Sequence, residues 1–283
     1  MAFAYRSSTS AGNASGGALS INKPTGTASG DLLVAVLYLE SDTNTFSSVP
    51  AGWQLAGSQA NTGLFKIWVY YLWAGGSEPA SYSWTPTTNA WRTWTMAAYS
   101  GGGGSGTQPD VANGSQGDGV VIATDQTAPS ITPSTDHDLL IFSYGNFSGT
   151  NVGSTSGKAT NLRISFGGTT IADFLDVSPA AATGTSSPSS GVGTQDYAAM
   201  HLAFFLSPAG PPSYDQSSFR FRNDDGSESG ASWRQSEGVD DSAALEEALR
   251  LRIQIDVTND APSAAYSLQY KRAADPDSEF RTI

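Results

Sequence analysis

The chain has 283 residues, of which 39% are hydrophobic and only 14% are charged, and its net charge is −12. The hydrophobic share is enough for a packed core, so the composition excludes a disordered chain. The acidic excess argues against binding to nucleic-acid phosphates or anionic membranes, and the lack of cysteine excludes disulfides and thiolate chemistry.

The amino-terminal segment gives no indication of export. Residues 1–15 read MAFAYRSSTSAGNAS, without the basic stretch and following apolar stretch of a secretory signal. The longest apolar run, residues 32–39, has eight residues, whereas a transmembrane helix needs about 20. We therefore expect a protein that is made in the cytoplasm without a signal peptide and that has no membrane partner.

Short runs rich in Val, Ile, Leu and aromatic residues, separated by glycine and proline, predict an all-β fold. The predicted strands are residues 32–39, 65–74, 81–85, 91–100, 139–147 and 199–206. In residues 65–74, FKIWVYYLWA, aromatic side chains occupy both alternating faces. Because successive side chains of a strand point to opposite faces of the sheet, we expect this strand to be buried on both sides or to lie against another surface.

An internal similarity links two distant parts of the chain. The stretch Ile21-Asn-Lys-Pro24 leads to Asp31-Leu32-Leu33 and then to an apolar strand. The stretch Ile131-Thr-Pro133 leads in the same way to Asp138-Leu139-Leu140. We interpret this as two hairpin-rich halves that fold face to face in one sandwich; a chance match of a short motif is the alternative.

Two polar stretches interrupt the strand pattern. Residues 101–106, GGGGSG, are not followed by the lysine that a phosphate-binding loop requires, so we predict a flexible loop. Residues 179–194, PAAATGTSSPSSGVGT, have the composition of a long polar loop.

A domain boundary is predicted at Ser207-Pro-Ala-Gly-Pro-Pro-Ser213, where three prolines in five residues favour a stiff, extended linker. We expect a large jelly-roll-like β-sandwich over residues 1–206 and a smaller immunoglobulin-like β-sandwich over residues 214–283. Within the second domain, residues 240–250 predict one or two helical turns or an extended, bulged segment before an alternating strand.

Residues suited to catalysis are few. The only histidines are His137 and His201, and no GxSxG motif accompanies them. Asp173 and Asp176 have the chemistry of a glycosidase pair, but nothing distinguishes them among 26 acidic residues. We expect no catalytic residue, no metal site and no cofactor.

Tryptophan is the more informative residue type. We consider Trp84, Trp91 and Trp94 as candidate contacts to a glycan or protein partner, because exposed aromatic rings stack on sugars. The alternative is that the seven tryptophans form an aromatic core. Trp91 and Trp94 are three residues apart, so a regular strand places them on opposite faces, and they cannot share one flat platform.

An acidic stretch, NDDGSE, lies within residues 219–233 and raises the question of a calcium site. With Gly226 as the sixth residue of an EF-hand loop, the first and twelfth positions fall on Phe221 and Ser232, which provide no carboxylate. The stretch is therefore interpreted as a turn built on Asp225-Gly226. Asp224, Asp225 and Glu228 are candidate turn or interface residues.

The flanking residues predict a hairpin with two different faces. Phe219 and Phe221 alternate with Arg220 and Arg222, which gives one buried face and one wet face. We expect Trp233 to return to the core beside the phenylalanines, and the arginines to pair with nearby carboxylates.

The first domain resembles a β-sandwich module that is frequent in tailed-phage structural proteins and some bacterial surface proteins. The residues that carry this resemblance are Gly30-Asp31-Leu32-Leu33, Pro50-Ala51-Gly52-Trp53, Tyr70-Tyr71 and Glu78-Pro79. The second domain resembles another module of the same proteins through RFRNDDGSESGASW, residues 220–233, and the strand pattern that follows it.

These resemblances imply a non-enzymatic structural component of a phage particle: a capsid decoration, a head fibre or a tail-associated protein. They imply location in the virion, contacts to other virion proteins, and assembly as a homo-oligomer through repeated copies. The alternative function is a carbohydrate-binding adhesin that recognises glycans on the host surface. An enzyme such as a depolymerase is the third hypothesis.

Overall fold

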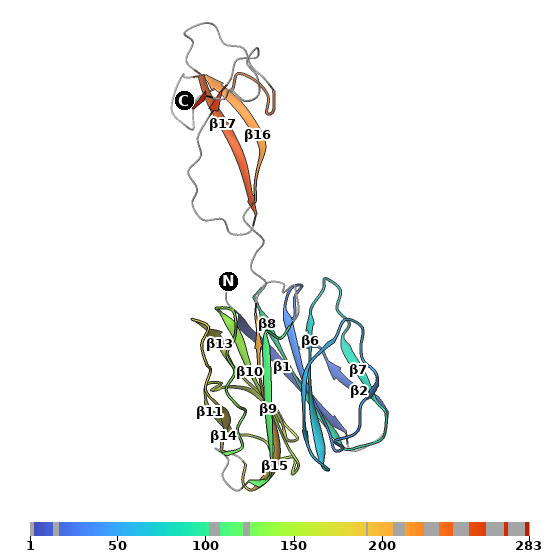
Figure 1. Cartoon of the computed structure of the whole chain (residues 1–283). Helices are drawn as coiled ribbons and strands as arrows, with labels where there is room; N and C mark the ends of the chain where they lie inside the picture. Colours follow the sequence, from blue (N-terminus) through green and yellow to red (C-terminus); the bar gives the residue numbers. More distant parts are fainter. Residues whose placement is uncertain are drawn as a thin grey trace. The chain divides into compact units, whose positions relative to one another are not determined.

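The computed structural model is built from β-strands. It describes residues 3–13, 17–101, 108–120, 125–190, 192–205, 213–223, 232–239, 249–258, 269–270 and 281–282. These residues contain no α-helix, so none of them forms a helix that could span a membrane, and the predicted all-β class is confirmed. The chain divides into two compact units, Met1–Ser207 and Pro208–Ile283, which we describe one at a time (Figure 1).

The first half of the first unit forms two sheets. A central antiparallel sheet has the order β1-β8-β3-β6-β5, with β1 Ala4–Asn13, β8 Arg92–Ser100, β3 Leu32–Leu39, β6 Phe65–Trp73 and β5 Gln54–Asn61. A smaller sheet has the order β2-β7-β4, with β2 Leu19–Asn22, β7 Ser81–Pro86 and β4 Phe46–Ser48. The smaller sheet covers the outer face of the central one (Figure 1).

The second half of this unit repeats the arrangement. Its central sheet has the order β12-β13-β10-β15-β9, with β12 Asn161–Phe166, β13 Thr169–Val177, β10 Asp138–Asn146, β15 Gln195–Phe204 and β9 Val111–Val120. On its outer face lie β11 Ser154–Gly157 and β14 Ser186–Ser190, and a bridge joins Ala128 to Ser186.

The two halves have the same strand order. When the strands are numbered in chain order within each half, both central sheets have the order first, eighth, third, sixth and fifth. Each outer layer reads second, seventh and fourth, with the segment at Ala128 in the second position of the later half. A chance match of two short motifs would not produce this correspondence, so the predicted pair of similar halves is confirmed.

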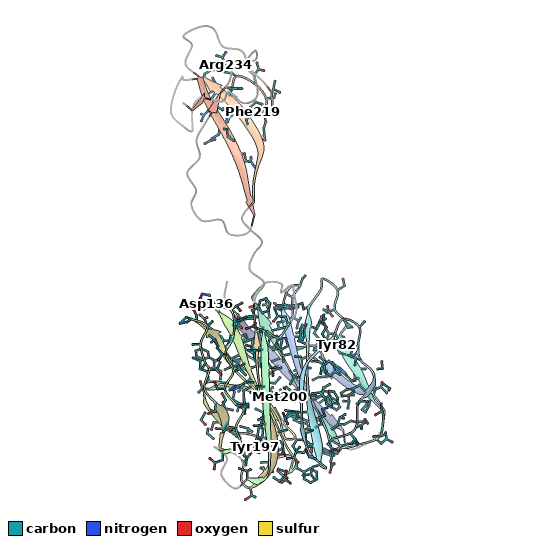
Figure 2. The ribbon with its side chains drawn as sticks, viewed as in Figure 1. Tyr82, Asp136, Tyr197, Met200, Phe219 and Arg234 are labelled. Atoms are coloured by element: carbon teal, nitrogen blue, oxygen red, sulfur yellow. The ribbon has the colours of Figure 1, made fainter. Side chains whose placement is uncertain are left out.

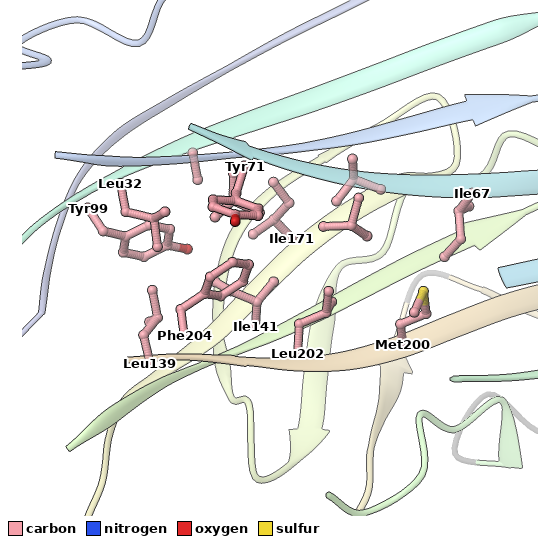
Figure 3. Packing of buried hydrophobic residues seen from close by; sticks show 14 of the residues in the cluster. Leu32, Ile67, Tyr71, Tyr99, Leu139, Ile141, Ile171, Met200, Leu202 and Phe204 are labelled. Carbon is pink, nitrogen blue, oxygen red and sulfur yellow. The ribbon is translucent and has the colours of Figure 1, made fainter. Parts of the chain in front are cut away.

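The central sheets of the two halves pack face to face around the main core. Figure 3 shows Leu32, Tyr71 and Tyr99 of the first half pointing toward Leu139 and Phe204 of the second. Alternate residues of β3 point into this core and into the outer aromatic layer, and all eight are therefore buried. The predicted burial of residues 65–74 on both sides is confirmed in the same way, because β6 contributes to both cores.

The repeated Asp-Leu-Leu motif marks the start of each central strand. Asp31 and Asp138 are both buried. Asp31 accepts a hydrogen bond of 2.7 Å from the amide of Ala28, and Asp138 accepts one from the hydroxyl of Thr135. Each carboxylate thus fixes the turn three residues before it. Asp31 also pairs with Arg6 at 2.6 Å, and no described residue makes the same pair with Asp138.

One predicted loop is partly wrong. Within residues 179–194, Ser186–Ser190 form β14, which pairs with β11. The hydroxyls of Ser156 and Ser187 lie 3.0 Å apart, and those of Ser154 and Ser189 lie 2.8 Å apart. Hydrogen bonds between hydroxyls replace apolar packing across this pair, so the strand has none of the hydrophobic pattern that predicts one. Of the glycine loop predicted at 101–106, all residues except Gly101 lie outside the described residues.

The second unit contains a long hairpin. Its strands are β16 Ser213–Asn223 and β17 Leu249–Thr258, and a short ladder joins β18 Gln269–Tyr270 to β19 Arg281–Thr282. Residues 232–239 run along β16: the amide of Asn223 donates to Ser232 O at 3.0 Å and that of Gly238 to Phe219 O at 2.8 Å. The immunoglobulin-like arrangement stays a prediction, as does the jelly-roll description of the first unit.

Other predicted features of this unit are only partly described. The chain returns along β16 at Ser232, so residues 224–231 connect the two segments. Asp224, Asp225 and Glu228 lie outside the described residues, as does the predicted proline linker at 207–213 except for Ser213, which begins β16. The helix predicted for residues 240–250 overlaps β17, which begins at Leu249, and its first nine residues also lie outside the description.

Candidate functional site

The three tryptophans that were candidate partner contacts occupy different environments. Trp84 and Trp94 are 0% and 3% exposed and belong to the outer aromatic layer of the first half. Their rings cannot stack on a ligand, so their role is corrected to packing. Trp91, directly before β8, is 40% exposed. The expectation that Trp91 and Trp94 do not share one platform therefore holds.

Trp91 borders a groove of about 410 Å³ in the first unit. The groove is lined by Gly12, Trp91, Thr93, Gly149, Asn151, Phe166 and Gly167. Phe166 is 39% exposed, so the groove presents two aromatic surfaces. The amide of Asn151 is exposed and, among the described residues, has no hydrogen-bond partner. A groove with apolar rings and a free amide has the composition of a small-ligand site.

Glycine residues shape this groove. Phe166 ends β12, and Gly167, with a positive φ of 53°, starts the turn into β13. A Cβ on Gly167 would lie 2.5 Å from Cγ2 of Thr93, and Thr93 donates a hydrogen bond of 3.0 Å to Gly167 O. A Cβ on Gly12 would lie 3.0 Å from the Phe166 ring. The absence of a side chain at residue 12 therefore lets the Phe166 ring lie close against the backbone of β1 without a shift.

The loop after β10 forms another wall of the groove and is held by the buried side chain of Asn146. Its Nδ2 donates to Thr150 O at 2.8 Å, and its Oδ1 accepts from the Thr150 amide at 3.0 Å. Ser148 donates its hydroxyl to the same oxygen at 3.2 Å. Three hydrogen bonds to one buried amide fix the loop, so the groove is preformed.

A second hollow of about 210 Å³ lies on the other side of this loop. It is lined by Gly119, Phe147, Ser148, Thr194, Gln195 and Asp196. Phe147 is 41% exposed. In the described part of the first unit, the exposed large apolar residues are Leu55, Trp91, Phe147 and Phe166. All three aromatic members of this set therefore gather around one loop.

The aromatic end of the unit is defined by strand register. Asn146, just before the loop, pairs with Tyr197 at the start of β15, whereas Leu139 pairs with Phe204 at its end. The groove thus lies at the end of the first unit opposite the one at which β15 finishes. Figure 2 shows Tyr197 and Met200 along β15, with Tyr197 nearer the end that carries the groove.

Carboxylates collect at the other end of the second half. Asp176 pairs with Nδ1 of His137 at 2.9 Å, and His137 itself has a positive φ of 67°. Asp173, the other carboxylate considered for a glycosidase pair, is buried and binds Arg163 through two contacts of 2.6 and 3.0 Å. These partners give both carboxylates structural roles. In the described part of the chain, no three His, Asp or Glu residues are grouped so as to hold a metal ion.

His201 is a core residue. It is fully buried in β15, its ring lies edge-on to Phe142, and its Nδ1 lies 2.9 Å from the carbonyl oxygen of Pro129. A carbonyl only accepts, so the ring donates from Nδ1. Burial lowers the pKa of His201 to about 4, while the bond to Pro129 works in the opposite direction. The histidine is therefore neutral at pH 7.

The buried carboxyl of Asp138 should make the free energy of unfolding depend on pH. Burial raises its pKa from 3.8 to about 6, although the hydrogen bond from Thr135 lowers it. The folded protein therefore binds this proton more tightly than the unfolded chain, and the stability it contributes below pH 4 is lost as the pH rises through 6. At about 1.4 kcal/mol per pH unit, the loss is about 3 kcal/mol.

Asp138→Asn is expected to remove this loss, because the amide keeps the acceptor for Thr135 and does not titrate. Urea unfolding at pH 4 and pH 7 should show wild type losing about 2 kcal/mol more than the variant over this interval, because part of the full loss lies below pH 4. Thr135→Val should move the midpoint of the wild-type loss to higher pH, since it removes the bond that lowers the pKa. Parallel pH profiles for wild type and Asp138→Asn would contradict the assignment.

In the second unit, Trp233 does not lie beside the phenylalanines as predicted. It is 38% exposed and pairs with Arg222 across the bridge, so it lies on the arginine face of the hairpin. The guanidinium carbons of Arg220 and Arg222 lie 4.2 and 4.9 Å from its ring centre. Arg222 is only 5% exposed, so the arginine face is not the solvent-exposed face that the sequence predicts. Cation–π contact between the two guanidinium groups and the ring explains why Trp233 lies on the arginine face.

The residues that the sequence did not single out are Phe147, Asn151 and Phe166. Phe166 stands directly before Gly167-Gly168, and an aromatic residue at a glycine turn lies at a hairpin tip, where it is seldom covered. That signal was available for Phe166. Asn151 lies in a polar loop and has no comparable pattern.

No protein-family model, curated protein or solved structure matches this chain.

Proposed function

We propose that this chain is a non-enzymatic structural component of a tailed-phage particle, present in repeated copies on the capsid, a fibre or the tail. The proposal is supported by the structural roles of the residues that carry the resemblance to phage structural modules. They are scaffold residues, which suits a protein whose task is to hold a shape and present a surface.

Three of these positions illustrate the point. Gly30 has a positive φ of 84° and donates its amide to Ala74 O at 2.7 Å. Trp53 is buried, with its ring centre 5.0 Å from that of Trp84. Glu78 accepts from the Gly75 amide at 2.7 Å and from the Tyr82 hydroxyl at 2.8 Å. Each residue closes a turn or fills the outer layer.

The face-to-face halves also suit a particle component. Both central sheets are covered on both faces, and their edge strands lie against each other, β1 beside β12 and β5 beside β9. Sheet edges that are covered do not recruit other chains indiscriminately. Contacts between copies then depend on side-chain surfaces, and weak contacts gain strength from repetition.

Mass spectrometry of purified particles from a phage that encodes this chain tests the proposal. We expect the chain at a fixed number of copies per particle, with a few copies indicating the tail and hundreds indicating the capsid. Particles that lack the chain would overturn the proposal.

A second candidate function, recognition of a host-surface saccharide, is favoured by the groove at Trp91. Trp91 and Phe166 offer apolar surface to the C–H face of a sugar ring, and Asn151 offers an amide to its hydroxyls. Sugar recognition requires this combination of ring contact and hydrogen bonding. The preformed loop also limits the entropy that is lost on binding.

Trp91→Ala is expected to abolish saccharide binding on a glycan array, or to weaken it at least tenfold, because the ring supplies most of the apolar contact. Asn151→Ala should weaken it less. Leu55→Ala is the matched control, since Leu55 is the one exposed large apolar residue described in the first unit that is not aromatic, and it lies on the edge strand β5. Equal loss in Trp91→Ala and Leu55→Ala would contradict a role for the groove.

A further inference from the structure

The arginine face of the second unit brings like charges together. Arg220 of β16 and Arg252 of β17 are directly paired across the hairpin (the orange and red strands of Figure 1). Residues directly opposite in an antiparallel pair have Cβ atoms about 5 Å apart, and like charges there are destabilising. This concentration of positive charge occurs in a chain whose net charge is −12. Among the described residues that line the cleft beside these arginines, Glu237 is the one carboxylate, so the two arginines outnumber it and the face attracts anions.

Trp233 holds one of these arginines in place. The guanidinium of Arg220 lies 4.2 Å from the Trp233 ring centre, and its Nε donates to Gln235 O at 3.0 Å. Arginine has five N–H donors in a planar fork, so one bond to a carbonyl leaves four. A guanidinium that is fixed by a ring and a carbonyl loses little entropy when it binds an oxyanion.

The two arginines border a cleft of about 370 Å³. It is lined by Ser218, Phe219, Arg220, Trp233, Glu237, Arg252, Ile253 and Gln254. Ser218 and Gln254 form the next cross-strand pair on the same face as the arginines, with the Ser218 hydroxyl 3.5 Å from the amide oxygen of Gln254. The volume is within the range of small-ligand sites, about 300–1,000 Å³. Figure 2 shows labelled Phe219 on the strand that forms one wall.

We propose that this cleft binds the oxyanion group of an acidic saccharide, with Arg220 and Arg252 on the anion. Ser218 and Gln254 provide neutral hydrogen-bonding groups for hydroxyls, and Trp233 provides apolar surface for the ring. The mixture favours a sugar over an acidic peptide, which would need charge alone. The site does not depend on the proposed particle role or on the groove at Trp91.

Titration calorimetry on the full chain at low salt tests the site. The probes are trigalacturonic acid, its methyl ester, a sugar phosphate and a triglutamate peptide. We expect trigalacturonic acid or the sugar phosphate to bind, more weakly as salt is raised, and the uncharged ester not to bind. Preference between the two anions identifies carboxylate or phosphate as the group recognised, and either result supports the site.

Variants then locate the binding. Arg220→Gln and Arg252→Gln should each weaken it at least tenfold, because a charge-assisted hydrogen bond is lost. Arg220→Lys should keep part of the affinity, since the charge stays but the fork is lost. Lys66→Gln removes the same charge from the first unit and should leave affinity within about twofold.

Three outcomes would overturn the proposal. The first is that neither acidic saccharide binds the wild-type chain. The second is that binding is unchanged in both Arg→Gln variants while their amide spectra show the hairpin intact. The third is that triglutamate binds through these arginines and the saccharides do not, which would assign the cleft to an acidic peptide.

Discussion

Replacing Trp84 by Ala is expected to lower the free energy of unfolding of the first unit by about 3–5 kcal/mol, the usual cost of removing a large aromatic side chain from a core. Trp84 is fully buried and pairs with Leu19 of β2. Its ring centre lies 5.0 Å from that of Trp53 and 6.1 Å from that of Tyr70. Removing it would leave a cavity between the outer layer and the central sheet.

Trp91→Ala is the matched comparison. Trp91 is 40% exposed and lines the groove, so its loss should cost about 1 kcal/mol or less. Trp84→Phe should also cost less than Trp84→Ala, because it keeps a ring and removes an indole N–H that has no hydrogen-bond partner among the described residues. Urea unfolding followed by tryptophan fluorescence measures all three, since six of the seven tryptophans are in this unit. Equal losses for Trp84→Ala and Trp91→Ala would refute the packing role.

Gly145→Val is expected to lower the free energy of unfolding by about 3 kcal/mol or more, through overpacking between the two halves. Gly145 lies in β10, and a Cβ there would lie 2.4 Å from Cγ2 of Ile67 in β6. The same Cβ would lie 3.5 Å from atoms of Phe65 and Tyr38. Both strands are central in their sheets, with a neighbour on each side, so neither can move aside easily.

The control for this substitution is Gly76→Val, because a Cβ at Gly76 meets no atom within 4 Å. It should change stability by about 0.5 kcal/mol or less. Adding Ile67→Ala to Gly145→Val should recover part of the loss, since the new side chain then occupies the space that Ile67 leaves. A double-mutant cycle measures this coupling. Independent, additive effects would mean that the two halves do not pack at this point.

The strands that could be predicted are the central ones. The predicted segments correspond to β3, β6, β7, β8, β10 and β15, all in or next to the cores and rich in apolar residues. Five strands of the central sheets were not predicted: the four edge strands β1, β5, β9 and β12, and the interior strand β13, whose sequence includes two aspartates. An edge strand is only partly buried, so small and polar residues suffice there, and the alternating pattern is weak.

The duplicated architecture was also available from sequence, because it depends on a local motif. Asp31 and Asp138 each accept a hydrogen bond from the residue three positions earlier. A turn of this kind is specified by neighbouring residues, so the same letters recur wherever the turn recurs. The pairing of the halves could then be inferred from the apolar strands that follow.

The sequence by itself thus determined the all-β class, the burial of the central strands on both sides and the repeat of similar halves. These properties follow from the period-2 arrangement of side chains and from short-range turns. Only the tertiary structure decided that Trp84 and Trp94 are core residues while Trp91 is exposed, that Phe166 and Asn151 join Trp91 in one groove, and that Trp233 lies with the arginines. The exposure of a side chain depends on which strand, distant in the sequence, covers it, and a local sequence pattern does not specify that strand.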